Sequence, residues 1–424
     1  MKILFLTNYY PPARYGWGYM QLCEEVADGL SARGHSVAVL TSTHFDGDKV
    51  LRTYPVYRYI QLDPDWYSPH SAARQFFFGR RKRERRAVEH VNELLRSFEP
   101  DIVFVWHAVG LPKAMLAEAE RYAKGKMVYY LADYQPELAD EYMDYWQGEP
   151  VHTLARLVKR PLSRLALAIL AREGKPVRLK YEHVICVSRY VRQRLLSRTL
   201  IPPSSVVIHN GVDLSKFRLN GKSKQKPEGD GLRCLVAGRV MQEKGIHTVV
   251  DAFAQLKSRE QLHGVSLTIL GDGPEPYVSS LRKKIEANRL QEHIQFQPPV
   301  DRSTMPEILS EYDALLLPSE YDEPLARAIQ EGMAMGLLVI GTVTGGSGEL
   351  LVDGKTGLVF EAGNSASLAE KLLFARRERD LVSEVRKAGQ AEILNNFNIA
   401  STIAQIENYL LTLVKSPDSY GKAV

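Results

Sequence analysis

Short apolar runs alternate along this chain with longer segments in which apolar residues recur at helical spacing. In the first half, the runs predict strands at 3–8, 36–42, 56–62, 101–107, 127–133, 184–188 and 206–211. In the second half, they predict strands at 232–239, 266–273, 294–299, 314–319, 338–343 and 357–362. The segment QLCEEVADGLSARG (21–34) is typical of the helices between them, with Gly34 as its C-terminal stop. Continuous apolar runs indicate strands that are buried on both faces, as in a parallel sheet covered by helices.

The alternation occurs twice, and a polar segment separates the two occurrences. Residues 214–231, LSKFRLNGKSKQKPEGDG, are charged and rich in Gly and Pro, which is typical of an interdomain linker. A chain of 424 residues also exceeds one ordinary domain. We therefore predict an α/β protein with two doubly wound domains, 1–212 and 213–395. Ligands of such sheets bind at the carboxyl ends of the strands, so we expect the site in the cleft between the domains.

Composition narrows the setting of the protein. No run of eighteen apolar residues occurs, so we expect no membrane span. Cys23, Cys186 and Cys234 are widely separated and match no disulfide or zinc pattern, which favours a reducing, cytoplasmic location. The start MKILFLTNYYPP has a short apolar run and no small-residue cleavage site. A buried first strand is therefore expected there in place of a signal peptide.

The positive charge is concentrated in one part of the chain. The net charge is +5, and residues 151–200 contain 12 basic and only 2 acidic residues. This concentration indicates a local basic surface, and we expect no nucleic-acid partner. Two segments, 76–86 (FFFGRRKRERR) and 153–174, combine apolar and basic residues as interfacial helices do, although Pro161 interrupts the second. They suggest a peripheral contact with an anionic membrane at its inner face. A core-facing helix with a solvated basic face is the alternative.

The stretch PSEYDEPLARAIQEGMAMG (318–336) places Glu323 and Glu331 around a helix start that we expect near Pro324. At ~1.5 Å per residue the two acids are roughly 12 Å apart along the helix. Catalytic pairs in glycosidases are ~5–9.5 Å apart, so a hydrolytic pair is disfavoured. The spacing suits the two ends of a long ligand whose phosphates meet the backbone N–H groups of Leu325 and Ala326. A helix-start charge and a solvated face are the alternatives for these glutamates.

Two cations follow the strand predicted at 232–239. Arg239 ends the strand and Lys244 lies five residues later, in GRVMQEKG. Fixed cations at the carboxyl end of a strand can hold a diphosphate and neutralise a departing phosphate. Two solvated surface residues would give the same pattern.

With these residues in place, the sequence resembles the retaining GT-B glycosyltransferases of glycosyltransferase family 4. Further motifs carry the resemblance along nearly the whole chain in the order the family has them. They are YYPPARYGWG (9–18), DIVFVWH ending at His107, VIHNGVD (207–213), LTILGDGP (267–274), GGSGEL (345–350) and DGKTGLVF (353–360).

The resemblance implies two Rossmann-like domains of GT-B fold, with the acceptor on 1–212 and the donor on 213–395. It also implies a C-terminal helix within 396–424 that packs back on the first domain. Arg239 and Lys244 would bind the donor diphosphate, Glu331 the ribose and Glu323 the donor sugar. The remaining assignments are His107 against the sugar, Gly16 and Gly18 close to the phosphates, Leu325 and Ala326 at the phosphate site, and Pro299 near the base. His107, Arg239, Lys244 and Glu323 would form the catalytic set.

The implied reaction moves a sugar from a nucleotide diphosphate sugar to a hydroxyl of a sugar, a lipid-linked molecule or a small molecule. It would retain anomeric configuration by front-face substitution and use neither metal nor cofactor. The chain departs from the family at Trp17, Ala326 and Pro298-Pro299, where glycine is more usual. Trp17, Asp133 and Tyr134 are candidates for acceptor contacts, with packing or ordinary loop polarity as the alternative. A nucleotide-sugar epimerase and a non-catalytic binding relative are the alternative functions.

Overall fold

The computed structural model describes residues 1–13, 17–48, 50–64, 69–138, 141–148, 153–174, 177–218 and 231–415. The chain forms two compact units. Unit 1 comprises Met1–Val187, Val191–Ile208 and Ile403–Val424, and unit 2 comprises Ser188–Tyr190 and His209–Thr402. These divisions lie near the predicted boundaries at 212/213 and 395/396. The predicted linker lies largely outside the described residues.

Unit 1 is built on a seven-stranded parallel sheet with the order β3-β2-β1-β4-β5-β6-β7. Its strands are β1 (Lys2–Thr7), β2 (Ser36–Ser42), β3 (Val56–Ile60), β4 (Ile102–His107), β5 (Met127–Leu131), β6 (His183–Cys186) and β7 (Val206–Val207). The strand order reverses between β1 and β4. That position is the switch point at which doubly wound sheets bind ligands.

Unit 2 repeats this topology in a six-stranded parallel sheet with the order β10-β9-β8-β11-β12-β13. Its strands are β8 (Leu232–Ala237), β9 (Val265–Leu270), β10 (Ile294–Gln297), β11 (Ala314–Leu317), β12 (Leu338–Gly341) and β13 (Leu358–Val359). Here the switch point lies between β8 and β11. Every strand predicted from the apolar runs is present, and the two-domain α/β prediction is confirmed.

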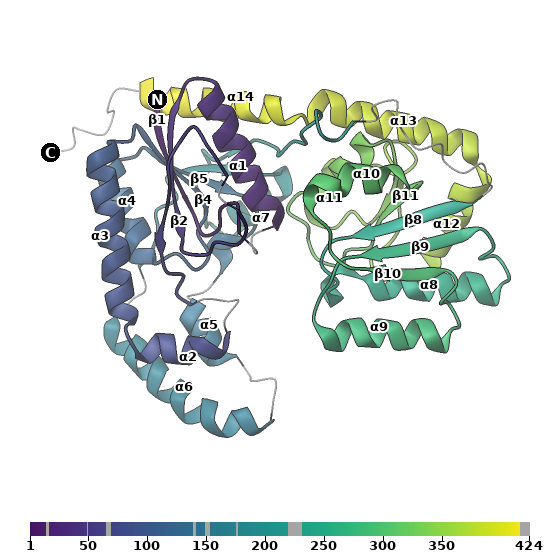
Figure 1. Cartoon of the computed structure of the whole chain (residues 1–424), viewed down its shortest axis with the longest axis horizontal. Helices are drawn as coiled ribbons and strands as arrows, with labels where there is room; N and C mark the ends of the chain where they lie inside the picture. The colour runs from purple at the N-terminus through teal and green to yellow at the C-terminus, as the bar shows by residue number, and fades with distance from the viewer. Residues whose placement is uncertain are drawn as a thin grey trace. The chain divides into compact units, whose positions relative to one another are not determined.

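Helices cover both faces of each sheet, as the continuous apolar strands require (Figure 1). Unit 1 carries α1 (Trp17–Ala32), α2 (Pro69–Phe77), α3 (Arg80–Phe98), α4 (Lys113–Ala123), η1 (Gln135–Glu137), α5 (Glu141–Gln147), α6 (Thr153–Glu173) and most of α7 (Arg189–Ser197). Unit 2 carries η2 (Gln242–Lys244), α8 (Ile246–Ser258), α9 (Glu275–Ala287), η3 (Arg302–Thr304), α10 (Met305–Ser310), α11 (Arg327–Ala334), η4 (Gly345–Glu349), α12 (Ser365–Arg377) and α13 (Arg379–Asn396).

Unit 1 has a second, smaller core outside its sheet. The helices α2, α5 and α6 lie together beyond the sheet (Figure 1), and the aromatic side chains of α2 and α5 pack on one another. The Phe76 ring meets the rings of Tyr142 and Trp146 edge-on at 4.9 and 5.4 Å. Ala166 of α6 closes this cluster and is fully buried. Of the two segments that combine basic and apolar residues in the sequence, 153–174 forms α6 of this layer, and 76–86 runs from the end of α2 into the start of α3.

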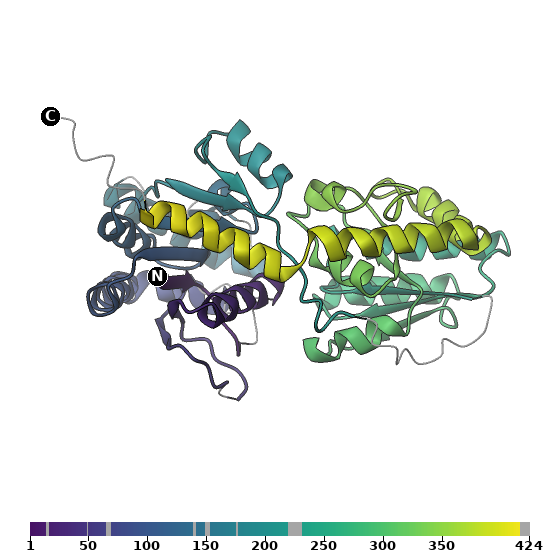
Figure 2. The same ribbon diagram turned by 90° about the horizontal axis from the view of Figure 1, so that it is seen from above.

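The last helix, α14 (Ile399–Lys415), passes from unit 2 into unit 1 after Thr402 and lies beside α1 (Figures 1 and 2). Glu407 accepts hydrogen bonds from Arg33 and His35, both at 2.7 Å. Ile403 packs so closely on Gly29 that a Cβ there would meet its Cδ1 at 2.4 Å. The RGH turn after α1 thus has a structural role.

Two local predictions are wrong. The helix expected near Pro324 begins at Arg327, because Leu325 and Ala326 belong to a buried loop with Ala326 in an extended conformation. Pro161 does not interrupt α6, which continues through it from Thr153 to Glu173. In the first case, the burial of Leu325 and Ala326 in the loop outweighs the local preference of proline for a first helical turn.

Candidate functional site

In unit 2, the loops after β8 and β11 meet at the switch point. The carbonyl of Glu243 in η2 accepts hydrogen bonds from the backbone N–H of Glu320 at 2.9 Å and of Tyr321 at 3.1 Å. Gly245 follows with a φ of 64°, and a Cβ there would lie 2.0 Å from the carbonyl oxygen of Pro318. Only glycine fits this close approach, which brings Lys244 against the residues that follow β11.

Lys244 and Glu323 form an ion pair at this junction. Lys244 Nζ donates to Glu323 Oε1 at 2.6 Å, and Ser319 Oγ donates to the same oxygen at 2.7 Å. The Glu323 side chain is 10% exposed and that of Lys244 is 21% exposed. Both of these bonds go to Oε1, and Glu323 Oε2 receives neither of them. Sequence reasoning selected Lys244 and Glu323 but missed Ser319, which no motif marks.

A glycine-rich turn supports the Glu323 loop from the β12 side. Gly346 N–H donates to the carbonyl of Glu323 at 2.6 Å, and a Cβ on Gly346 would lie 2.0 Å from the carbonyl oxygen of Pro324. Thr342 Oγ1 donates to the carbonyl of Ser319 at 2.6 Å. The GGSGEL segment therefore fixes the backbone that carries Glu323.

Glu331 has different partners. It lies in α11, is 5% exposed, and forms an ion pair with Arg302 of η3. Arg327 Nε lies 3.6 Å from Glu331 Oε1, one helical turn away. Like Ser319, Arg302 is a partner of a candidate glutamate that the sequence analysis did not select. The two glutamates thus face different cations.

The remaining unit 2 candidates lie at the ends of strands. Arg239 follows β8 and Pro299 follows β10, and both are exposed. Leu325 and Ala326 are buried and precede α11. Ala326 is the residue that caps the N-terminus of α11, and Leu325 precedes it by one residue in the loop.

In unit 1, His107 ends β4 beside the switch point. Its Nε2 lies 2.8 Å from Asp133 Oδ2, and its ring stacks on Tyr19 with centroids 4.0 Å apart. Trp106 Nε1 donates to the carbonyl of Tyr19 at 2.8 Å and fixes the first turn of α1. The His107 Nδ1 atom is buried without a hydrogen-bond partner in the described part of the chain. The structure therefore brings together His107 and Asp133, and adds Tyr19, which sequence reasoning missed.

The other unit 1 candidates differ in their surroundings. Tyr134 is buried, with the Arg194 guanidinium 4.1 Å from its ring centroid, and Arg194 also pairs with Glu137 at 2.8 Å. The Tyr134 ring thus packs against the Arg194 guanidinium in a cation–π contact. Gly18 is the second residue of α1 and does not lie in a loop. Gly16 and the side chain of Trp17 lie outside the described residues.

Glu349 ties the short segment Ser188–Tyr190 into unit 2. Burial raises the pKa of its carboxyl group, but hydrogen bonds from His209 and from the backbone N–H groups of Tyr190 and Arg189 outweigh burial and lower the pKa overall. The His209 bond is 2.8 Å long and the Tyr190 bond 2.9 Å. Glu349 is therefore a structural carboxylate that works in its ionised form.

Two family models match the chain, one over most of each half. Residues 21–216 match the model described as Glycosyltransferase Family 4, and residues 219–392 match that described as Glycosyl transferases group 1.

Two curated relatives show how far the sequence similarity extends. The putative colanic acid biosynthesis glycosyltransferase WcaL of Salmonella typhimurium is 31% identical over 231 residues, which cover 52% of this chain and 54% of that protein. The chain thus spans about half the length of that relative. The GDP-mannose-dependent alpha-(1-6)-phosphatidylinositol monomannoside mannosyltransferase of Mycobacterium tuberculosis is 24% identical, covering 96% of this chain and 98% of that protein.

Solved structures share the fold along nearly the whole chain. The Rickettsia africae glycosyltransferase has a TM-score of 0.70 at 19% identity, over 98% of this chain and 99% of that one. Anabaena Alr3699/HepE, solved in complex with UDP and glucose, has a TM-score of 0.68 at 20% identity, over 97% of this chain and 100% of that one. The likeness supports the GT-B fold.

Proposed function

We propose that this chain, whose two halves match glycosyltransferase family models, transfers a sugar from a nucleotide diphosphate sugar to a hydroxyl acceptor with retention of anomeric configuration. The observation that carries the proposal is the cluster of Lys244, Glu323 and Ser319 at the switch point of unit 2. Because a Lys ammonium has three donors, Lys244 can keep its bond to Glu323 and also donate to a donor phosphate.

The two ends of the donor would be held by the two acids. Glu323 offers Oε2 to hydroxyls of the sugar, and Glu331 offers its carboxylate to the ribose in place of part of its ion pair with Arg302. Arg239 and Lys244 would neutralise the diphosphate between them. With this arrangement the residues need neither a metal ion nor a cofactor to stabilise the leaving group.

The chemical step would be a front-face substitution. The bond between the anomeric carbon and the phosphate oxygen breaks, and its electron pair stays on the departing diphosphate. The acceptor oxygen bonds to the anomeric carbon on the same face, and its proton passes to the departing phosphate oxygen. His107, which contacts Asp133 and Tyr19, would bind the sugar that is transferred. No separate base on the protein is required.

The acceptor that we propose is lipid-linked, presented at an anionic membrane surface by the helical layer of unit 1. Phe78 is 73% exposed and Leu165 54% exposed, and Arg160 and Arg164 are exposed on α6. Exposed apolar side chains beside arginines are what peripheral helices use on anionic lipid. No helix within the described residues is long and apolar enough to cross a bilayer.

A thermal-shift panel of nucleotides and nucleotide sugars tests the donor assignment, because a ligand that binds only the folded state raises the melting temperature. One nucleotide diphosphate and its sugar conjugate should raise it, and a panel without any shift would contradict the proposal. NMR of the product, taken early in the reaction, should show the anomeric configuration of the donor. Incubation without acceptor distinguishes an epimerase, which would convert the donor alone. Flotation with anionic vesicles at low salt tests the membrane contact, and absence of binding would exclude it.

A further inference from the structure

Arg302 is held beside Glu331 in unit 2 by two contacts. Its guanidinium forms an ion pair with the Glu331 carboxylate and lies 5.5 Å from the centroid of the Phe217 ring. Phe217 is buried, and the Glu331 side chain is 7% exposed, whereas that of Arg302 is 29% exposed. Arg302 is therefore the most accessible member of this group.

The Arg302 guanidinium has more donors than the protein uses. An arginine side chain has five N–H donors and no acceptor. Within the described residues, this side chain donates a hydrogen bond only to Glu331. A second guanidinium, that of Arg327, lies 3.6 Å from the same Glu331 oxygen, so the carboxylate is shared. A ligand beside Arg302 therefore meets hydrogen-bond donors, and it needs acceptors to satisfy them.

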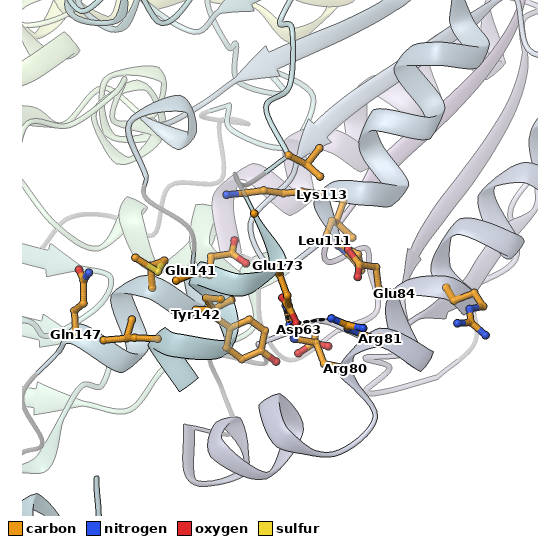
Figure 3. Close-up of a pocket in the computed structure, with 18 residues that line it drawn as sticks. Asp63, Arg80, Arg81, Glu84, Leu111, Lys113, Glu141, Tyr142, Gln147 and Glu173 are labelled. Carbon is orange, nitrogen blue, oxygen red and sulfur yellow. Dashed lines mark hydrogen bonds and ion pairs between the residues drawn. The ribbon is translucent and has the colours of Figure 1, made fainter. Parts of the chain in front are cut away.

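A similar group in unit 1 shows that two arginines on one carboxylate do not by themselves select a ligand. Arg80 and Arg81 both donate to Glu173, as the dashed lines in Figure 3 show. They line a pocket of about 750 Å³ whose charged lining residues are four cations (Arg80, Arg81, Arg85 and Lys113) and four carboxylates (Asp63, Glu84, Glu141 and Glu173). Because these charges balance, that pocket favours no class of ligand. At Arg302 the selection comes instead from the ligand groups that lie beside Glu331.

The position of Arg302 relative to a bound nucleotide follows from the ribose. The proposed function places the ribose hydroxyls on Glu331, which keeps part of its ion pair with Arg302. Two hydrogen bonds of ~2.8 Å then meet at one carboxylate, so an Arg302 nitrogen lies at most roughly 8 Å from a ribose hydroxyl oxygen. Arg302 also comes three residues after Pro299, which the resemblance to the family puts near the base. Arg302 is thus placed on the base side of the ribose.

The edge of the base on that side differs among nucleotides. The 2′-hydroxyl lies on the minor-groove side of a nucleotide, together with one edge of the base. On this edge a pyrimidine presents its O2 acceptor and adenine its N3 acceptor, whereas guanine adds its 2-amino group as a donor. A guanidinium can donate to O2 or N3, but it has no acceptor for an amino group. Guanine would therefore set donor against donor and leave both unpaired, which weakens binding.

We propose that Arg302 reads this edge of the base and selects against guanine. The donor substrate is then a uridine, cytidine or adenosine diphosphate sugar, and Arg302 donates to O2 or N3 of its base. This inference rests on the proposed function, because it narrows the class of donor for the same site. Arg302 determines specificity and takes no part in breaking the bond to the leaving group.

Calorimetry with two matched pairs of nucleotides tests the proposal without any sugar transfer. IDP and GDP differ only in the 2-amino group, and IDP should have the lower Kd by about tenfold, within the range that one good base contact contributes. UDP and 2-thio-UDP differ only in the acceptor at position 2. UDP should bind about tenfold more tightly, because sulfur is a weak acceptor. Equal Kd values within either pair, or tighter binding of GDP than of IDP, would overturn the proposal.

A variant locates the effect at Arg302. Arg302→Met keeps the aliphatic stem and removes the donors, so both ratios should fall to within about twofold. Any change in the hold on the ribose affects IDP and GDP equally, so their ratio isolates the base edge. Arg81→Met is the control, because it removes one of two guanidiniums from Glu173 in unit 1, and it should keep the ratios of the wild type. Unchanged ratios in Arg302→Met would overturn the proposal, because another group would then read the base.

Failure of this inference is distinguishable from failure of the proposed function. Nucleotides that bind without regard to the group at position 2 would overturn the role of Arg302 and leave the transferase proposal in place. A protein that binds none of the four diphosphates would contradict the donor site itself, and with it both proposals. The wild-type pairs decide between these outcomes even if Arg302→Met fails to fold.

Discussion

Replacing Lys244 with methionine removes one charge and keeps most of the aliphatic stem. In the structure the ammonium donates to Glu323 at 2.6 Å, and both side chains are mostly buried. A hydrogen bond between charged groups contributes about 1.5–3 kcal/mol to folding, so the stability of unit 2 should fall by about this amount. Turnover should fall further, by about 10²–10³-fold, because a charge that stabilises the leaving group contributes about 2.7–4 kcal/mol to the transition state.

The distribution of tryptophan allows unit 2 to be followed separately. All four tryptophans, residues 17, 66, 106 and 146, belong to unit 1. Urea unfolding followed by tryptophan fluorescence therefore reports unit 1, and circular dichroism reports both units. Lys244→Met should shift the circular-dichroism transition and leave the fluorescence transition in place.

A double-mutant cycle with Glu323→Gln measures the ion pair itself. If the pair exists in solution, the two substitutions should be non-additive in stability by about 1–3 kcal/mol. Additivity within about 0.5 kcal/mol would show that Lys244 and Glu323 do not interact. Wild-type turnover in Lys244→Met would remove Lys244 from the donor site, whatever the stability data show.

Three further outcomes are expected. Glu331→Gln should weaken nucleotide-sugar binding by about 10–100-fold in calorimetry, because a charged acceptor for the ribose hydroxyls is lost, and unchanged affinity would remove Glu331 from the donor site. Gly346→Ala should destabilise unit 2 by about 1–3 kcal/mol, because the new Cβ would lie 2.0 Å from the carbonyl oxygen of Pro324. Gly348→Ala is the control and should have little effect, because the atom nearest to its Cβ would be 3.6 Å away. Equal unfolding midpoints for the two variants would contradict this packing. Folding lowers the pKa of Glu349, so its ionised carboxylate stabilises the protein above about pH 4.3, and this stabilisation is lost as the pH falls below that value. The free energy of unfolding of Glu349→Gln should therefore fall less steeply with acidification than that of the wild type. Parallel curves of unfolding free energy against pH would contradict this role of Glu349.

The strands could be predicted because each one requires a hydrophobic pattern within its own segment of the sequence. A strand buried on both faces needs a continuous apolar run, and each predicted run coincides with an observed strand. The rule that ligands bind at strand ends then directed attention to Lys244 and Glu323. Their contact depends on β8 and β11 being neighbours, which follows from the doubly wound order even though 79 residues separate the two side chains.

The start of α11 was not predictable from its own residues. Pro324 is a good first helical residue by local preference, but Leu325 and Ala326 are buried in a loop that Gly346 holds from the end of β12. That support comes from a segment more than twenty residues away. The residues around Pro324 alone therefore do not predict where α11 begins.

The partners of the candidate residues were also missed for a physical reason. The contact of Ser319 with Glu323 depends on the direction in which the serine side chain points. The same holds for the contacts of Tyr19 with His107 and of Arg302 with Glu331. Serine, tyrosine and arginine are common on loops and helices, and no spacing distinguishes these three. Only coordinates show which of them point toward a glutamate or a histidine.

Neither compact unit is one uninterrupted stretch of polypeptide. Ser188–Tyr190 belongs to unit 2 through Glu349 and through the bond from the Tyr190 hydroxyl to Asp322 at 2.8 Å, and the end of α14 completes unit 1. A gene cut after codon 208 would therefore yield two incomplete folds. The first product would lack the helix that covers Gly29, and the second would lack a three-residue segment that bonds to Asp322 and Glu349 in the loops after β11 and β12. Isolated halves should aggregate or unfold, and studies of either unit are best made on the intact polypeptide.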